Sequence, residues 1–144
     1  MYSTMSSPFG RSGHPASAYR QVGVETGVST GSPHQLVAML FDGYMDALAQ
    51  ARGALRQGQI EAKGRAIGRA VRIIEEGLKA GLNLTGGGEL AKDMRDLYDY
   101  VTLRLTQANL HNNEAMLEEC QSLIEPLRSA WISIGPQVSA GAAK

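Results

Sequence analysis

The stretch SPHQLVAMLFDGYMDALAQARGALRQG, residues 32–58, carries the clearest helix signal in the chain. Ser32 is a typical N-cap, and Pro33 suits the first helical position because its missing N–H would have no partner there. Gly58 is expected to end the helix, which therefore runs to about Gln57. Apolar residues recur inside it at intervals of three and four, at Leu36, Leu40, Tyr44, Ala47, Ala51 and Leu55. One apolar stripe of this kind predicts an amphipathic helix that packs against other helices.

Three further amphipathic helices are predicted downstream, over residues 59–82, 89–110 and 113–134, with the same apolar spacing. The expected core residues are Ile60, Ile67, Val71, Ile74 and Leu78 in the first; Leu90, Met94, Leu97, Val101, Leu105 and Ala108 in the second; and Met116, Cys120, Leu123, Ile124, Leu127, Trp131 and Ile134 in the third. Four such helices joined by short loops can bury their stripes only against one another. We therefore predict an all-α protein, an antiparallel four-helix bundle.

Turn-forming residues mark the ends of these helices. Asn112 and Asn113 are expected to end the third helix and cap the fourth, and Gly135-Pro136 to end the fourth. Pro126 lies inside the fourth helix and is expected to kink or divide it. The predicted organisation is a disordered tail at 1–17, an N-terminal cap segment at 18–31, the bundle at 32–135 and a disordered tail at 136–144.

The composition excludes several classes of partner and location. Lys plus Arg and Asp plus Glu are 14 each, and this zero net charge argues against nucleic acid or an anionic membrane as the main partner. The only cysteine, Cys120, forms no intrachain disulfide, which favours a reducing compartment. No signal peptide and no run of about 20 apolar residues is present, so we expect a cytosolic protein without membrane insertion.

No catalytic or metal-binding pattern emerges from the sequence. His14, His34 and His111 are scattered, none follows a Glu at the spacing that a di-iron bundle requires, and we expect His34 and His111 to be solvated at helix ends. The glycines before Glu89 lack the Lys and Ser/Thr of a phosphate-binding loop. Cys120 lies on a core stripe, which predicts a buried and inert thiol. We therefore expect a non-enzymatic protein without cofactors.

Several apolar residues lie outside the core stripes and indicate a surface for a partner. They are Tyr100, Leu103 and Leu110 on the third helix, Phe41 and Met45 on the first, and Ile73 on the second. Such a face is typical of a groove for a partner helix or of a homodimer surface, and a wide core face is the structural alternative. Glycines inside the helices, at positions 43, 53, 64, 68, 77 and 81, favour close helix packing or a shallow groove.

The ordered set of motifs along residues 18–134 resembles the FliS family. The segment AYRQVGVET precedes SPHQLVAMLFDGYMDALAQA, and GGELAKDMRDLYDYVTLRLTQANLHNN follows, with its Leu-Tyr-x-Tyr and Arg-Leu-x-x-Ala-Asn patterns. Trp131 near the end of the fourth helix also fits. The long Ser/Gly-rich leader and Pro126 depart from the usual pattern.

The resemblance implies a cytosolic chaperone that binds the C-terminal helical segment of flagellin, prevents its premature polymerisation and supports its delivery to the flagellar type III export apparatus. An export-gate component and other flagellar regulators are further implied partners, and a homo-oligomeric interaction protein is the alternative. The candidates for the flagellin groove are Phe41, Met45, Tyr98, Tyr100, Leu103, Arg104, Asn109 and Leu110. The candidates for an N-terminal segment that covers this groove are Tyr19, Val22 and Val24.

Overall fold

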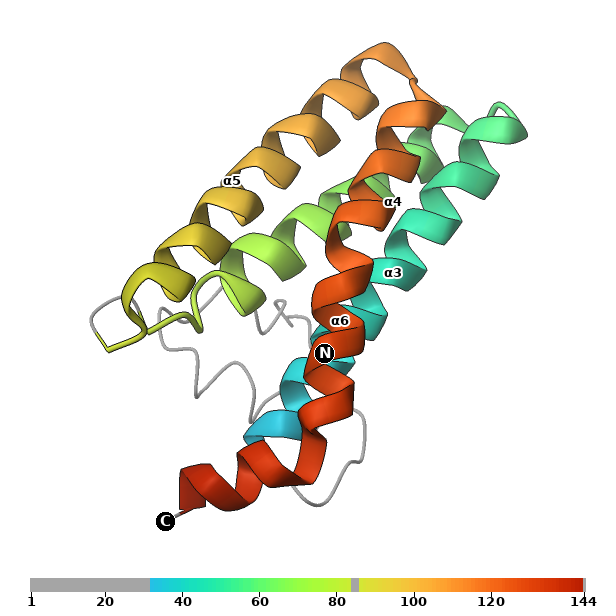
Figure 1. Ribbon diagram of the computed structural model, residues 1–144. Coiled ribbons are helices and arrows are strands. Elements are labelled where there is room, and N and C mark those ends of the chain that lie inside the picture. The colour runs from blue at the N-terminus through green and yellow to red at the C-terminus, as the bar shows by residue number, and fades with distance from the viewer. Residues whose placement is uncertain (1–31, 84–85, 144) are drawn as a thin grey trace, which may run out of the picture.

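The computed structural model describes residues 32–83 and 86–143, and every secondary-structure element in these residues is a helix (Figure 1). The elements are α3 (Pro33–Arg56), α4 (Ile60–Arg72), the π-helix η1 (Ile73–Leu78), α5 (Gly88–His111) and α6 (Glu114–Ala143). Each helix packs against its neighbour in the chain, and α6 returns to pack against α3. Because short turns join successive helices, neighbours run antiparallel, which confirms the predicted four-helix bundle (Figure 1). The predicted cap residues Tyr19, Val22 and Val24 and the tail at 1–17 lie outside the described residues.

The helix ends follow the predicted capping chemistry. The Ser32 hydroxyl accepts a hydrogen bond from the Gln35 N–H at 3.4 Å, and Pro33 occupies the first turn of α3. Asn112 ends α5 in the left-handed conformation, with φ 51°. The Asn113 side chain accepts a hydrogen bond from the Met116 N–H at 3.1 Å and so caps α6.

The core is built around two tyrosines and aliphatic side chains from all four helices. Tyr44 and Tyr98 are almost fully buried, and the Tyr44 hydroxyl donates a hydrogen bond to the Cys120 carbonyl oxygen at 3.0 Å. Burial raises the pKa of the Cys120 thiol to about 12, so this group is protonated and unreactive at neutral pH. The prediction that Cys120 is buried is confirmed, and the raised pKa supports the prediction that its thiol is inert.

Three expected core residues are instead exposed, and all three lie near helix ends. Ile60 begins α4, Leu90 lies in the first turn of α5, and Ile134 precedes the break in α6. Ile73, which was expected to lie outside the stripe, is buried, with its Cδ1 facing Gly43 of α3. The reason is that α4 and η1 are covered by α3 on one side and by α5 on the other, so their buried face is wider than one stripe.

The helix predicted over residues 59–82 is not regular along its length. Its second part is the π-helix η1, and the Lys79 N–H donates to the Ile74 carbonyl oxygen at 2.7 Å, an i→i+5 bond. Gly77 lies against Leu40 of α3, and a Cβ at Gly77 would meet the Leu40 methyl carbons at 3.1 and 3.2 Å. At this position the glycine allows the close helix approach that the sequence favours.

Pro126 was predicted to kink or divide the helix, but it does not interrupt α6. Its fixed φ is compatible with a helix, and non-helical backbone angles within α6 occur only at Gly135, with φ 17° and ψ −117°. This break coincides with the predicted end at Gly135-Pro136. Helical backbone then resumes and continues to Ala143.

Candidate partner-binding surface

The outer side of α5 exposes two leucines that the bundle leaves uncovered. Leu103 is 54% exposed and Leu110 is 74% exposed, although the core residues Val101 and Leu105 on the same helix are fully buried. The two leucines are two turns apart, so they lie one above the other on the side of α5 opposite the core. The sequence predicted this exposed pair.

Ile60 of α4 is a further exposed apolar residue, on the neighbouring helix. Lys63 and Gly64, one turn further along α4, both face Asn109 of α5: the Lys63 ammonium binds Asn109, and a Cβ at Gly64 would lie 3.8 Å from its side-chain oxygen. Ile60 therefore lies on the side of α4 that faces α5, close to the helix end that carries Leu110, and it is 48% exposed. We refer to Ile60, Leu103 and Leu110 as the α4–α5 face.

Tyr100 and Arg104 tie the other side of α5 to α6 through Glu119. The Tyr100 hydroxyl donates to Glu119 Oε2 at 2.7 Å, and Arg104 Nε donates to Oε1 at 2.9 Å. These two hydrogen bonds lower the pKa of the Glu119 carboxyl, and the bond to Glu119 raises the pKa of Tyr100. The Tyr100 side chain remains 43% exposed, so its ring is available to a partner while its hydroxyl is held.

Asn109 has a structural partner that the sequence did not predict. Lys63 is 3% exposed as a whole residue, and its ammonium donates to the Asn109 carbonyl oxygen at 2.9 Å and to the Asn109 side-chain Oδ1 at 2.6 Å. No carboxylate pairs with Lys63 among the described residues. The negative C-terminal end of the α5 dipole favours the cation instead. The sequence does contain a sign of this contact: Lys63 lies at helical spacing from both Ile60 and Ile67, on an apolar stripe where a lysine needs a buried partner.

A model of the family described as "Flagellar protein FliS" matches residues 15–138. The chain belongs to the FliS family. It is 49% identical over 122 residues to the flagellar secretion chaperone FliS of Salmonella typhimurium. The aligned residues make up 85% of this chain and 90% of that protein. The proteins of the same name from Vibrio cholerae (38% over 120 residues, 83% and 88% covered) and Bacillus subtilis (32% over 118 residues, 82% and 84% covered) are also similar.

Phe41 and Tyr98, two of the groove candidates in this FliS-family chain, are core residues. Phe41 is 2% exposed and Tyr98 is 1% exposed, so neither contacts a partner in this conformation, and their prediction as groove residues is corrected. The buried faces of α3 and α5 are wider than one apolar stripe because two neighbouring helices cover each of them. Met45 is partly buried against the core. Of the eight candidates, the exposed side chains are Tyr100, Leu103 and Leu110.

The FliS-like Trp131 pairs with His34, which the sequence placed in solvent. The two rings stack with centroids 5.1 Å apart and an interplanar angle of 11°. Trp131 Nε1 donates to the His34 carbonyl oxygen at 3.0 Å, and His34 Nε2 donates to the Trp131 carbonyl oxygen at 2.8 Å. This reciprocal pair joins the start of α3 to the far part of α6, so it stabilises one end of the bundle.

Within the part of the chain that the structure describes, no group of three or more His, Cys, Asp or Glu side chains is arranged to hold a metal ion. None of the described helices combines the length and apolar character needed to cross a lipid bilayer.

Proposed function

We propose that this chain holds the C-terminal segment of flagellin on the α4–α5 face, prevents its premature polymerisation in the cytoplasm and supports its delivery to the flagellar type III export apparatus. Membership of the FliS family, whose relatives are named flagellar secretion chaperones, makes the chain a flagellar export chaperone. The observation that supports the client site is the exposure of Ile60, Leu103 and Leu110 on adjacent helices.

The physical basis of the proposal is the cost of leaving this surface in water. Full burial of one Leu or Ile side chain contributes about 1.5–3 kcal/mol, so three such residues provide a substantial driving force for a partner helix with an apolar stripe. A helix laid on two neighbouring helices matches the helix-in-groove mode of recognition. A client that folds as it binds loses entropy, and the apolar contact has to offset that loss.

In this proposal, the chain prevents polymerisation of the client without any catalytic step. A client helix that lies against the α4–α5 face hides the surface with which it would otherwise join a polymer. Contacts with an export-gate component and other flagellar regulators remain predictions.

Residues 18–31 are the proposed cover of this face when the client is absent, through Tyr19, Val22 and Val24. A client that displaces such a cover binds less tightly by the free energy of displacement. Deletion of residues 1–25 should therefore strengthen client binding or leave it unchanged. A large loss of affinity in a truncated chain that keeps its helical circular dichroism would contradict the gating role.

The decisive experiment is calorimetric titration of the chain with a peptide from the C-terminal helical region of the cognate flagellin. Tight binding with a negative heat-capacity change is expected, because apolar surface is buried. Leu110→Asp should weaken binding by at least about tenfold, an effect of ~1.4 kcal/mol. Leu90→Asp is the matched control, because Leu90 is 70% exposed on the same helix near its other end, and it should leave affinity within about twofold.

Equal weakening by both substitutions would show that the client does not use the α4–α5 face. Self-association is the second candidate, because an exposed apolar face of this kind also suits a homodimer. Sedimentation of the chain alone tests it: a concentration-dependent dimer that Leu110→Asp dissociates, together with no peptide binding, would favour the homodimer over the chaperone site.

A further inference from the structure

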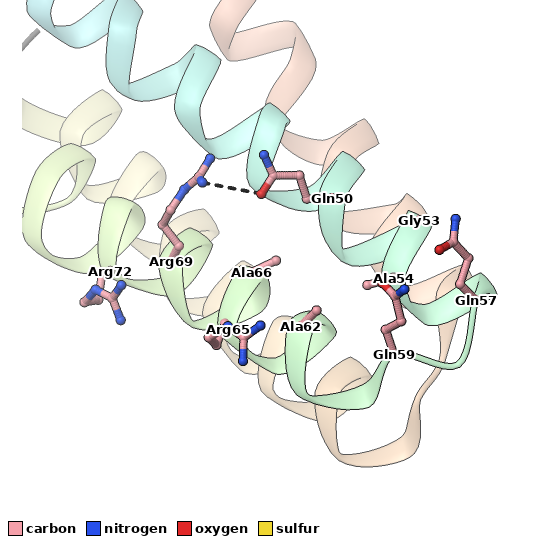
Figure 2. Close-up of a pocket in the computed structure, with 10 residues that line it drawn as sticks. All are labelled: Gln50, Gly53, Ala54, Gln57, Gln59, Ala62, Arg65, Ala66, Arg69 and Arg72. Atoms are coloured by element: carbon pink, nitrogen blue, oxygen red, sulfur yellow. Dashed lines mark hydrogen bonds between the residues drawn. The ribbon is translucent and has the colours of Figure 1, made fainter.

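The side of α4 that faces away from α5 lines a hollow against α3. Its cavity volume is about 570 Å³, and its lining comes from the second half of α3 and from α4 (Figure 2). Small residues from both helices, Gly53, Ala54, Ala62 and Ala66, lie in this lining. Because these side chains are short, the backbone of another chain can approach closely here. We call this hollow the arginine groove.

The charges of the arginine groove are of one sign. Arg65, Arg69 and Arg72 line it, together with the amide side chains Gln50, Gln57 and Gln59, and no carboxylate is among the lining residues. Asp46 and Glu61, which lie on the same two helices, form no ion pair with the three arginines within the described part of the chain. A cluster of like charges without local compensation favours an anionic partner.

The three arginines differ in how they are held. Arg69 donates from Nη2 to the Gly43 carbonyl oxygen at 3.2 Å and from Nη1 to Gln50 Oε1 at 3.5 Å, so it links α4 to α3 (Figure 2). Arg65 and Arg72 are exposed, and the side chain of neither forms an ion pair with another described residue. Their guanidinium groups are therefore available, and guanidinium binds carboxylate through paired, charge-assisted hydrogen bonds.

We propose that the arginine groove is a second binding site, separate from the α4–α5 face, and that it holds an acidic segment of a partner protein. The amides of Gln50, Gln57 and Gln59 suit the polar groups of a peptide backbone. A cavity of this size takes a short segment rather than a whole domain. This proposal does not depend on the identity of the client on the α4–α5 face.

Charge and composition select this occupant over two others. The chain's own residues 1–31 contain Arg11 and Arg20 against the single acid Glu25, so they carry the same sign as the groove. Binding of single-stranded nucleic acid relies on aromatic side chains on which bases stack, and no aromatic residue is among those that line the groove. The carboxylates of an acidic peptide match both the charge and the lining.

Titration of the full-length, 15N-labelled chain with N-acetylated hexaglutamate tests the proposal. Backbone amide shifts are expected at groove residues such as Gly53, Ala62 and Ala66, and hexaglutamine should produce none. Arg65→Gln/Arg72→Gln should weaken hexaglutamate binding by at least about tenfold, because two charge-assisted contacts are lost. Lys92→Gln/Arg95→Gln on α5 makes the same change in net charge and should weaken it by less than about twofold.

The proposal would be overturned by the absence of shifts with hexaglutamate, by shifts centred elsewhere, by equal weakening in the two double variants, or by tighter binding of a short oligothymidylate than of hexaglutamate. Addition of the flagellin peptide tests the separation of the two sites. Simultaneous binding supports a second site, and displacement of hexaglutamate overturns it. Failure of the flagellin peptide to bind bears on the α4–α5 face alone.

Discussion

Two helices of equal length, α3 and α5, are used differently by the bundle. Each has 24 residues, but α3 has eight buried residues and α5 has five. All large apolar side chains of α3 are at least partly buried, whereas α5 exposes Leu90, Tyr100, Leu103 and Leu110. Both helices contact a neighbour on each side, so the number of neighbours does not explain the difference.

The difference lies in the side chains at the helix contacts. Small residues such as Ala47, Ala51 and Ala54 form part of the buried face of α3 and allow close packing. The buried face of α5 has two alanines, Ala91 and Ala108, and its sides carry long polar links such as Lys79–Asp99 at 2.6 Å and Arg104–Glu119 at 2.9 Å. The α3 helix also has such links to α6, for example Arg52–Glu114 at 3.1 Å, but it combines them with more alanines. Long side chains hold two helices further apart than alanines do. The α3 helix is therefore the centre of the core, while α5 is attached at its edges and presents its outer side.

The largest expected effect contrasts one leucine from each helix. Leu48→Ala removes a fully buried side chain of α3 and should lower the free energy of unfolding by about 2–5 kcal/mol. Leu103→Ala removes an exposed side chain of α5 and should change it by no more than about 0.5 kcal/mol. Urea unfolding followed by circular dichroism measures both. A loss at Leu103 as large as that at Leu48 would show that the outer side of α5 is covered in solution.

An intermediate effect is expected where α5 is anchored to α4. Asn109→Ala removes one of two acceptors of the buried Lys63 ammonium and should cost about 1–3 kcal/mol, because a desolvated cation is left partly unsatisfied. Lys63→Met removes the charge and keeps an apolar side chain in place, so it should cost less. Thermal and urea unfolding of both variants decide the order. The reverse order would mean that the lysine itself stabilises the contact beyond its need for a partner.

The smallest effect is the pH dependence of the two carboxylates that attach α3 and α5 to α6. Hydrogen bonds from Arg56 and Arg52 lower the pKa of Glu114, and hydrogen bonds from Tyr100 and Arg104 lower that of Glu119. The unfolded chain therefore binds more protons in acid, so this stabilisation is present above the ordinary value of 4.5 and is lost as the pH falls through the lowered folded pKa values.

Unfolding midpoints measured from pH 6 down to pH 3 should decrease, and Glu114→Gln and Glu119→Gln should each make the decrease shallower. The exposure of both groups to solvent keeps each change small. If neither substitution alters the pH dependence of the unfolding midpoint, the acid sensitivity arises from other groups than Glu114 and Glu119. A larger change for Glu119 than for Glu114 would show that α5 depends more on its polar links than α3 does.

The site was predictable to a smaller extent than the fold. Leu103 and Leu110 were found because their angular position on α5 opposes that of Val101, a relation that holds in any straight helix. Phe41 was misplaced because periodicity treats each helix as having one covered side, and here each helix has two. Tyr98 became a groove candidate through the Leu-Tyr-x-Tyr resemblance, and a motif does not tell a core tyrosine from an exposed one. The arginine groove was missed because it needs residues of α3 and α4 together, and neither helix shows the hollow alone.

The sequence alone determined the helices, their caps at Ser32, Asn112 and Asn113, the break at Gly135 and the all-α class, because these depend on residues a few positions apart. Tertiary structure decided the π-helix η1, the buried Lys63–Asn109 contact and the stacked His34–Trp131 pair, whose members are 97 positions apart. The physical reason is that local periodicity describes the faces of one helix. Which faces are covered, and by which side chains, depends on how neighbouring helices approach each other.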